Sequence, residues 1–403
     1  MRMRILLGAG VAVLAAVIGF AMYQWSSHSD LSEAQMAARM EEAEAAFART
    51  DYAEVAEILT ELSEAGLPLA QYRLGLMYRE GRGVEIDLDR AIALLEDAAA
   101  QEWTAAEDAL IGLYLERAEA ASEPSEEIDW LERASRRGDI GATAVMGSYY
   151  FSGTGVERDL VRGLRLLTEA AEAGDVRAQS NLGYAYSTGT GVARDDARAL
   201  HWYQMAAEAG MVRAQAAVGL FYETGRGTEP DTAEAVRWYL NVLGEGVPGI
   251  SARLGALVAS GQIGAEQFPN AQVWVLDAAR AGDGASLRWT EERADSGDAA
   301  ALNALAVMYE TGEGVPQHDA RALDYFRQAA EAGAPSAQLA MARRFAAGQG
   351  VTQDYVQAHV WANLAAANGA AEAAGERDVF ARFLTPEQLA EAQNRAADWQ
   401  PSQ

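Results

Sequence analysis

Residues 175–210 read DVRAQSNLGYAYSTGTGVARDDARALHWYQMAAEAG and contain the pattern that decides the fold. Apolar side chains recur every four residues in the first half and at steps of three and four in the second, as on one face of an α-helix. Between the halves, Gly189 and Gly191 favour positive φ, and Asp195 is a typical N-cap. Gly210 stands where a helix commonly ends. The segment therefore predicts two helices joined by a tight loop.

The same pattern recurs every 36 residues along most of the chain. The aromatic residue before the loop is found at Tyr78, Tyr114, Tyr150, Tyr186, Tyr222, Tyr309 and Phe345. The closing glycine is found at Gly66, Gly138, Gly174, Gly210, Gly246, Gly282, Gly333 and Gly369. A bulky pair on the second helix keeps the same step until Trp274, but the next pair begins at Tyr325, 51 residues later. Fifteen residues, 283–297, are therefore inserted there.

One helical hairpin cannot bury both of its apolar faces, so neighbouring hairpins must stack. We predict an all-α protein, an α-solenoid of about nine 36-residue repeats, with the aromatic residues of the bulky pairs packed in the core. The loop of the second repeat is expected to depart from the pattern, because Arg117 replaces its first glycine. The predicted segments are an N-terminal anchor or signal sequence (1–25), a linker with a divergent capping repeat (26–66), repeats (67–282), a helical insert (283–297), repeats (298–369) and C-terminal capping helices (370–403).

The segment Ile5–Tyr23 is uncharged and apolar and follows Arg2 and Arg4. At about 1.5 Å per residue it matches the roughly 30 Å apolar thickness of a bilayer. We expect a single-pass helix in the bacterial inner membrane, with the arginines in the cytoplasm and the repeats in the periplasm. The alternative is a signal peptide cleaved near Ala21, which would leave a soluble periplasmic protein.

Composition excludes several functions. The net charge is −27, so the chain should repel nucleic acid. All 32 basic residues are arginines, and there is no cysteine, which excludes Lys-dependent and Cys-dependent chemistry. The four histidines, at positions 28, 201, 318 and 359, are far apart and form no metal-binding pair. We therefore expect neither a cofactor nor a metal.

The spacing A-x-x-x-L-G-x-x-Y-x-x-G-x-G-V-x-x-D, followed by A-x-x-W-Y-x-x-A-A-x-x-G, resembles the Sel-1-like repeat family, a relative of tetratricopeptide repeats. The residues that carry the resemblance are Ala178, Leu182, Gly183, Tyr186, Gly189, Gly191, Val192, Asp195, Ala199, Trp202, Tyr203, Ala206, Ala207 and Gly210. The resemblance covers most of residues 67–369. It implies a scaffold for protein complexes, with the first helices lining a concave face.

The residue before the repeated aromatic varies between repeats, as a recognition surface would. Met77, Tyr149, Phe221 and Met308 occupy this position, and such side chains are typical interface anchors. We predict that they line a groove for one or more partner proteins or peptides. The alternative interpretation is that they only pack against the adjoining repeat.

The predicted function is a non-catalytic scaffold or adaptor in the bacterial envelope. An alternative is a hydrolase of peptidoglycan or β-lactams built on the same fold, although no G-x-S-x-G motif is present. A third alternative is a self-assembling structural element. The identity of the partner, the oligomeric state and the role of the insert do not follow from the sequence.

Overall fold

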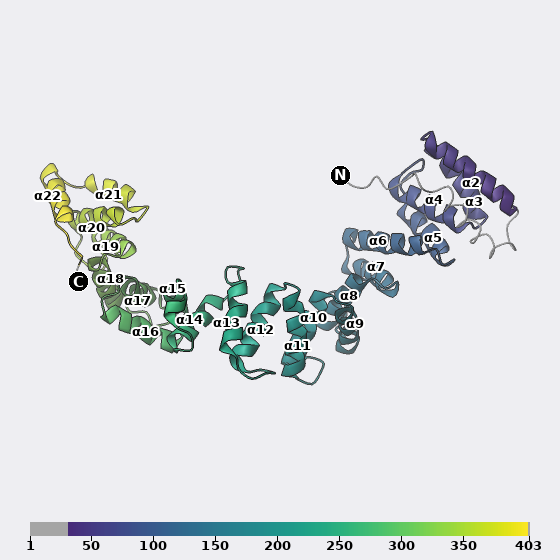
Figure 1. Cartoon of the computed structure of the whole chain (residues 1–403). Coiled ribbons are helices and arrows are strands. Elements are labelled where there is room, and N and C mark those ends of the chain that lie inside the picture. The colour runs from purple at the N-terminus through teal and green to yellow at the C-terminus, as the bar shows by residue number, and fades with distance from the viewer. Residues whose placement is uncertain (1–30, 402–403) are drawn as a thin grey trace. The chain divides into compact units, whose positions relative to one another are not determined.

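Helices alone make up the regular structure of residues 31–401, the part of the chain that the computed structural model describes (Figure 1). These residues form 21 α-helices and one short 3-10 helix and contain no strand. The prediction of an all-helical solenoid is confirmed. None of these helices combines the length and apolar character needed to cross a bilayer. The predicted membrane helix, Ile5–Tyr23, lies outside the described residues.

The chain divides into two compact units, and the division falls inside α11 (Asp196–Glu208). Before it lie α2 (Glu33–Ala48), α3 (Tyr52–Glu64), α4 (Pro68–Glu80), α5 (Leu88–Ala99), α6 (Thr104–Ala120), α7 (Pro124–Arg136), α8 (Ile140–Ser152), α9 (Leu160–Glu172) and α10 (Val176–Thr188). After it lie α12 (Val212–Thr224), α13 (Thr232–Val242), α14 (Ile250–Ala259), η1 (Ala265–Gln267), α15 (Ala271–Arg280), α16 (Gly284–Asp295), α17 (Ala299–Thr311), α18 (Asp319–Glu331), α19 (Pro335–Ala347), α20 (Tyr355–Ala367), α21 (Ala373–Ala381) and α22 (Pro386–Ala397).

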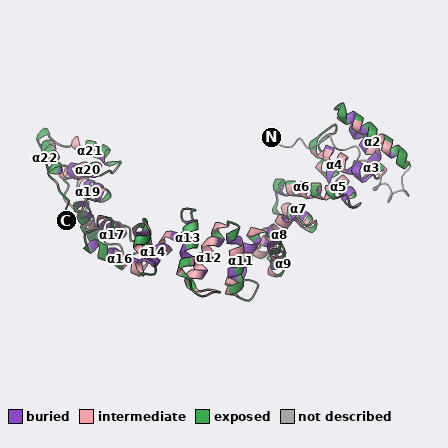
Figure 2. Cartoon of the chain, in the orientation of Figure 1, coloured by how far each residue is buried: buried purple, intermediate pink, exposed green. Residues whose placement is uncertain are grey.

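Within each unit, helices pack mainly against their neighbours in sequence. In the first unit α4 packs on α5 and α8 on α9, and in the second unit α14 packs on α15 and α17 on α18. Buried residues are accordingly spread along the chain in successive small clusters (Figure 2). This is the arrangement expected when each repeat completes the core of the next.

The predicted loop chemistry is confirmed. Gly189 and Gly191 have φ values of 74° and 73°, and all the closing glycines also have positive φ. The aspartates that begin the second helices accept a hydrogen bond from a backbone N–H of the first turn; they are Asp87, Asp159, Asp195, Asp231 and Asp354. Glu123 begins α7 without such a bond, and its repeat has Arg117 in place of the first loop glycine.

The core prediction for the bulky pairs needs one correction. Trp202 and Trp238 are only half-buried, whereas the partners that follow them, Tyr203 and Tyr239, are buried. Trp274 is an exception, because it is itself buried.

The insert and the C-terminal segment add single helices to the second unit. α16 occupies the insert, and its Leu287 and Trp289 contact two different apolar clusters of that unit. α21 and α22 pack against α20. Thr385 caps α22 and forms a capping box with Gln388.

His359, on α20, provides a pH-dependent test of this C-terminal packing. It is 3% exposed, its Nδ1 has no hydrogen-bond partner among the described residues, and burial, followed by the charge of Arg377, lowers its pKa. Asp378 is the nearby group that opposes this shift.

We expect wild-type protein to lose more stability than His359→Gln as the pH falls from about 7.5 to about 5.5. The unfolded chain binds a proton near pH 6.5 and the folded chain only at lower pH, so the free energy of unfolding falls as pH decreases through that window. Each pKa unit of difference corresponds to about 1.4 kcal/mol. Urea midpoints followed by tryptophan fluorescence measure the effect, and equal pH dependence in the two proteins would contradict it.

Candidate interaction surface

Three of the four residues predicted to line a groove are buried, as in the alternative interpretation that they pack against the adjoining repeat. Met77 on α4, Phe221 on α12 and Met308 on α17 are buried within their own units. Phe221, for example, contacts the ring of Tyr203 edge-on, with the ring centres 5.6 Å apart. α4 packs against both α3 and α5, and α17 against both α16 and α18, so the position before the aromatic faces inward on these helices. This corrects the predicted exposure of these three side chains.

Tyr149, on α8, is half-buried and remains a candidate contact residue. Its hydroxyl donates a hydrogen bond of 2.6 Å to Glu127 on α7. That hydrogen bond, together with burial, raises the pKa of Tyr149. The phenol is therefore a neutral group held between two helices of the first unit.

The repeated tyrosine has a structural partner that the sequence reasoning missed. In four repeats an arginine twelve residues later places its guanidinium over the tyrosine ring. The pairs, with the distance from Cζ to the ring centre, are Arg90 over Tyr78 (4.7 Å), Arg162 over Tyr150 (4.1 Å), Arg198 over Tyr186 (5.5 Å) and Arg321 over Tyr309 (5.4 Å). The constant Tyr–Arg spacing is the signal that could have revealed them.

A second column joins the successive repeats. A glutamine in the first helix donates its side-chain amide to the carbonyl oxygen eight residues earlier, at the end of the preceding repeat. The bonds are Gln71 to Ser63, Gln179 to Ala171, Gln215 to Ala207 and Gln338 to Ala330, between 3.1 and 3.5 Å long. In the second repeat Glu107 takes this position, and its carboxylate pairs with Arg137 instead.

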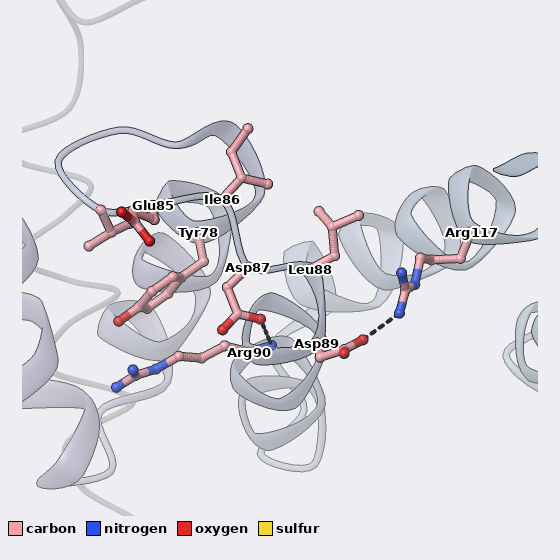
Figure 3. A pocket seen from close by; sticks show the side chains of 9 residues that line it. Tyr78, Glu85, Ile86, Asp87, Leu88, Asp89, Arg90 and Arg117 are labelled. Carbon is pink, nitrogen blue, oxygen red and sulfur yellow. Dashed lines mark hydrogen bonds and ion pairs between the residues drawn. The ribbon is translucent and has the colours of Figure 1, made fainter.

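The second repeat also has an altered loop. α6 runs for 17 residues, and Arg117 lies inside it at the position of the first loop glycine. Arg117 pairs with Asp89 at the start of α5, beside an open hollow of about 570 Å³ (Figure 3). Ile86, which also lines the hollow, is 67% exposed.

Trp130 contacts one arginine from the lining of this hollow and one from the lining of a second hollow. The guanidinium groups of Arg117 and Arg133 both lie over its ring, 5.1 and 4.6 Å from the centre. Tyr114 stacks against Trp130 with the ring centres 5.8 Å apart. The Tyr114 hydroxyl donates to Glu96, and burial and that hydrogen bond raise the pKa of Tyr114 to about 12.

The second hollow, of about 830 Å³, is lined by charged side chains from the end of α7. Its lining includes Arg133, Arg136 and Arg137 as well as Glu96 and Glu107. We call Arg117, Trp130, Arg133, Arg136 and Arg137 the second-repeat surface. It combines an aromatic ring with four guanidinium groups in a strongly acidic protein.

The described histidines are dispersed. His201 lies beside Trp202, the Nδ1 atom of His318 accepts a backbone hydrogen bond at the start of α18, and His359 is buried in α20. Residues 31–401 contain no group of three acidic or histidine side chains placed to hold a metal ion.

Comparison with known proteins identifies the repeats. The family model for the Sel1 repeat matches residues 68–102, 141–175, 176–211, 212–240, 299–333 and 335–369, together just over half of the chain. The unmatched segments include the second repeat and the insert. Proteins built from this repeat are generally protein-interaction scaffolds and are typically non-catalytic.

The individual proteins that this chain resembles share limited sequence identity with it. An uncharacterized protein of Neisseria meningitidis serogroup B is 36% identical over 107 residues, which are 26% of this chain and 22% of that protein. The chain thus matches about a fifth of that relative's length. Among solved structures, a protective antigen of uropathogenic Escherichia coli with an SLR fold is 26% identical and has a TM-score of 0.44, covering 86% of this chain and 79% of that one. A Sel1 repeat protein from Oxalobacter formigenes is 28% identical and has a TM-score of 0.42, and the match covers 79% of this chain and 88% of that one.

Proposed function

Because the chain belongs to the Sel1 repeat family, we propose that it is a non-catalytic scaffold that binds a partner protein or peptide. One observation favours the second repeat as the place where the partner binds. The second repeat has lost the family pattern but keeps its interior, since Leu110, Leu113 and Leu131 are buried. The departures include Glu107, Arg117 and the altered loop, and also Ile111, which replaces the glycine found at this position in the neighbouring repeats. A repeat that keeps its buried leucines while its loop and its charged side chains change is a suitable place for partner recognition.

The chemistry of this surface supports binding more than catalysis. Arg117 and Arg137 are engaged with Asp89 and Glu107, and the buried hydroxyl of Tyr114 stays protonated at neutral pH. Such groups stabilise and orient a contact, and none of them is poised to exchange a proton near pH 7. No observation favours the hydrolase alternative.

The location in the envelope is also part of the proposal. The apolar segment Ile5–Tyr23, preceded by two arginines, supports a tether to the inner membrane with the repeats in the periplasm. Fusing a reporter enzyme that is active only in the periplasm to the C-terminus tests this. Activity is expected for the full chain, and an inactive but stable fusion would exclude the periplasmic location.

Site-specific photocrosslinking tests the scaffold function. A photoreactive residue replaces Asp129, which is exposed and lies one turn before Arg133 on α7. The control position is Arg177, which is exposed on α10, in a matched repeat. We expect crosslinks to a defined protein from Asp129 alone, followed by direct binding of that purified protein to the chain in calorimetry.

Two results would overturn the proposal. One is the absence of any protein that crosslinks at Asp129 and binds after purification. The other is measurable turnover of peptidoglycan or β-lactam substrates by the purified chain, which would establish the hydrolase alternative.

A further inference from the structure

The geometry of the second-repeat surface points to the kind of partner: we propose that Arg133 and Arg136 bind the carboxylates of an acidic peptide segment. This inference rests on the proposed scaffold function and adds the chemical class of the partner. Three observations support it, namely the charge register of the repeats, the ends of the other second helices, and the pairing of the arginines.

The first observation is a local reversal of charge. At the position equivalent to Arg133, four other repeats have an acidic residue: Glu61, Asp97, Glu169 and Asp277. At the position equivalent to Arg136, four other repeats also have an acidic residue: Glu64, Glu172, Glu208 and Glu331. At the position of Arg133, no other repeat has a basic residue. At the position of Arg136, one other repeat has a basic residue, Arg280. The second repeat therefore replaces negative charge with positive charge at two neighbouring places.

The second observation argues against a purely local role at a helix end. Arginines in a last helical turn stabilise the helix by complementing its dipole. However, α3, α5, α9, α11, α13, α18 and α20 have no basic residue in their last turn. The fold evidently does not require this stabilisation at the ends of its second helices, so it does not explain the arginines of α7.

The third observation concerns which charges are available. Within the described part of the chain, Arg133 has no carboxylate partner, and its guanidinium lies over Trp130. Arg136 shares the single carboxylate of Glu132 with Arg162, at 2.9 and 2.7 Å, and the Arg136 side chain is 71% exposed. Arg137, by contrast, is already paired with Glu107. Arg133 and Arg136 thus offer donors to a ligand without first losing a buried partner.

The chemistry of the guanidinium group identifies the occupant. Its planar fork matches a carboxylate through two parallel hydrogen bonds, and the contact with Trp130 limits the freedom of Arg133 before binding. The hollow of about 830 Å³ beside these residues has room for more than one side chain. A net charge of −27 repels a long polyanion such as nucleic acid, so a short acidic segment with limited total charge fits best.

Fluorescence anisotropy with the full chain tests the inference. The probes are a labelled short peptide of alternating Glu and Gly and the same peptide with Gln in place of Glu. The test variant is Arg133→Glu combined with Arg136→Glu. The matched control is Arg177→Glu combined with Arg213→Glu, which changes the net charge equally at two exposed arginines of other repeats.

We expect the Glu peptide to bind and the Gln peptide to bind at least about tenfold more weakly, because each charge-assisted hydrogen bond is lost. The test variant should lose affinity for the Glu peptide by about tenfold or more, and the control variant should bind like wild type. Substituting both residues with Lys keeps the charge but removes the planar fork, so intermediate affinity is expected. Unchanged unfolding midpoints confirm that all the variants fold.

Equal binding of the Glu peptide by the test variant and wild type would overturn the inference, as would equal binding of the two peptides. Competition by inorganic phosphate as effective as by the Glu peptide would also overturn it, because the surface would then recognise anions in general. If these results occur while Asp129 still crosslinks to a defined partner, the acidic-segment inference fails alone. If the crosslinked partner is also missing, the scaffold function fails with it.

Discussion

Replacing Gly255 with Ala should destabilise the second compact unit by about 2–3 kcal/mol, because the added methyl group has no room. A Cβ at Gly255 on α14 would lie 2.0 Å from the carbonyl oxygen of Trp274 on α15. That atom belongs to the backbone of the neighbouring helix, so the two helices must move apart. The same close approach recurs at Gly75, Gly147 and Gly219, where the nearest atom would be 2.6 to 2.9 Å away.

Gly112 on α6 provides the matched control. A Cβ there would meet nothing within 4 Å, and its backbone is helical. Gly112→Ala should therefore stabilise the protein by about 0.5–1 kcal/mol, the usual gain from alanine in a helix. Urea unfolding followed by circular dichroism measures both effects, with hydrogen exchange of α14 and α15 for Gly255→Ala and of α6 for Gly112→Ala. Stabilisation by both substitutions would show that close packing does not require a glycine at position 255.

The second large effect is expected at the C-terminal end. Phe380→Ala should cost about 3 kcal/mol or more, because it leaves a cavity in a packed cluster. Phe380 on α21 is 8% exposed and packs with Ala342, Ala358 and Ala362 of the last repeat. Its loss should release α21 from α20 and expose the end of the solenoid.

Phe383 is the control for this prediction. It is 59% exposed and stacks on Tyr355 with the ring centres 4.4 Å apart. Phe383→Ala should cost about 1 kcal/mol, the value of an aromatic pair with little buried area. Hydrogen exchange of α20 and α21 distinguishes the two variants. A loss of protection as large for Phe383→Ala as for Phe380→Ala would mean that the stacked pair, and not the buried ring, holds the terminal helices.

Much of the fold was predictable because repetition amplifies weak local signals. A single glycine or aspartate indicates little, but Gly189, Gly191 and Asp195 recur in register with their counterparts in other repeats. The structure confirms the positive φ angles of these glycines and the capping by Asp195. The insert at residues 283–297 was predictable for the same reason, because it interrupts a constant period.

The candidate site was much less predictable. Met77, Phe221 and Met308 were expected at a surface because they vary between repeats, but variation also occurs in a core that tolerates apolar exchange. Arg133 and Arg136 could have been found by comparing charges along the register. Their significance depends on Trp130, Glu132 and the adjacent hollow, which no spacing reveals.

The sequence by itself determined the repeat length, the all-helical class, the turns and caps, and the family. These properties depend on interactions within a few residues of each other, and they are copied along the chain. Only the tertiary structure decided which side of each helix is buried, why glycine is required where α14 meets α15, and which arginines remain available for a ligand. Those properties depend on the distance and orientation between helices, and side chains from neighbouring repeats set them through packing and pairing.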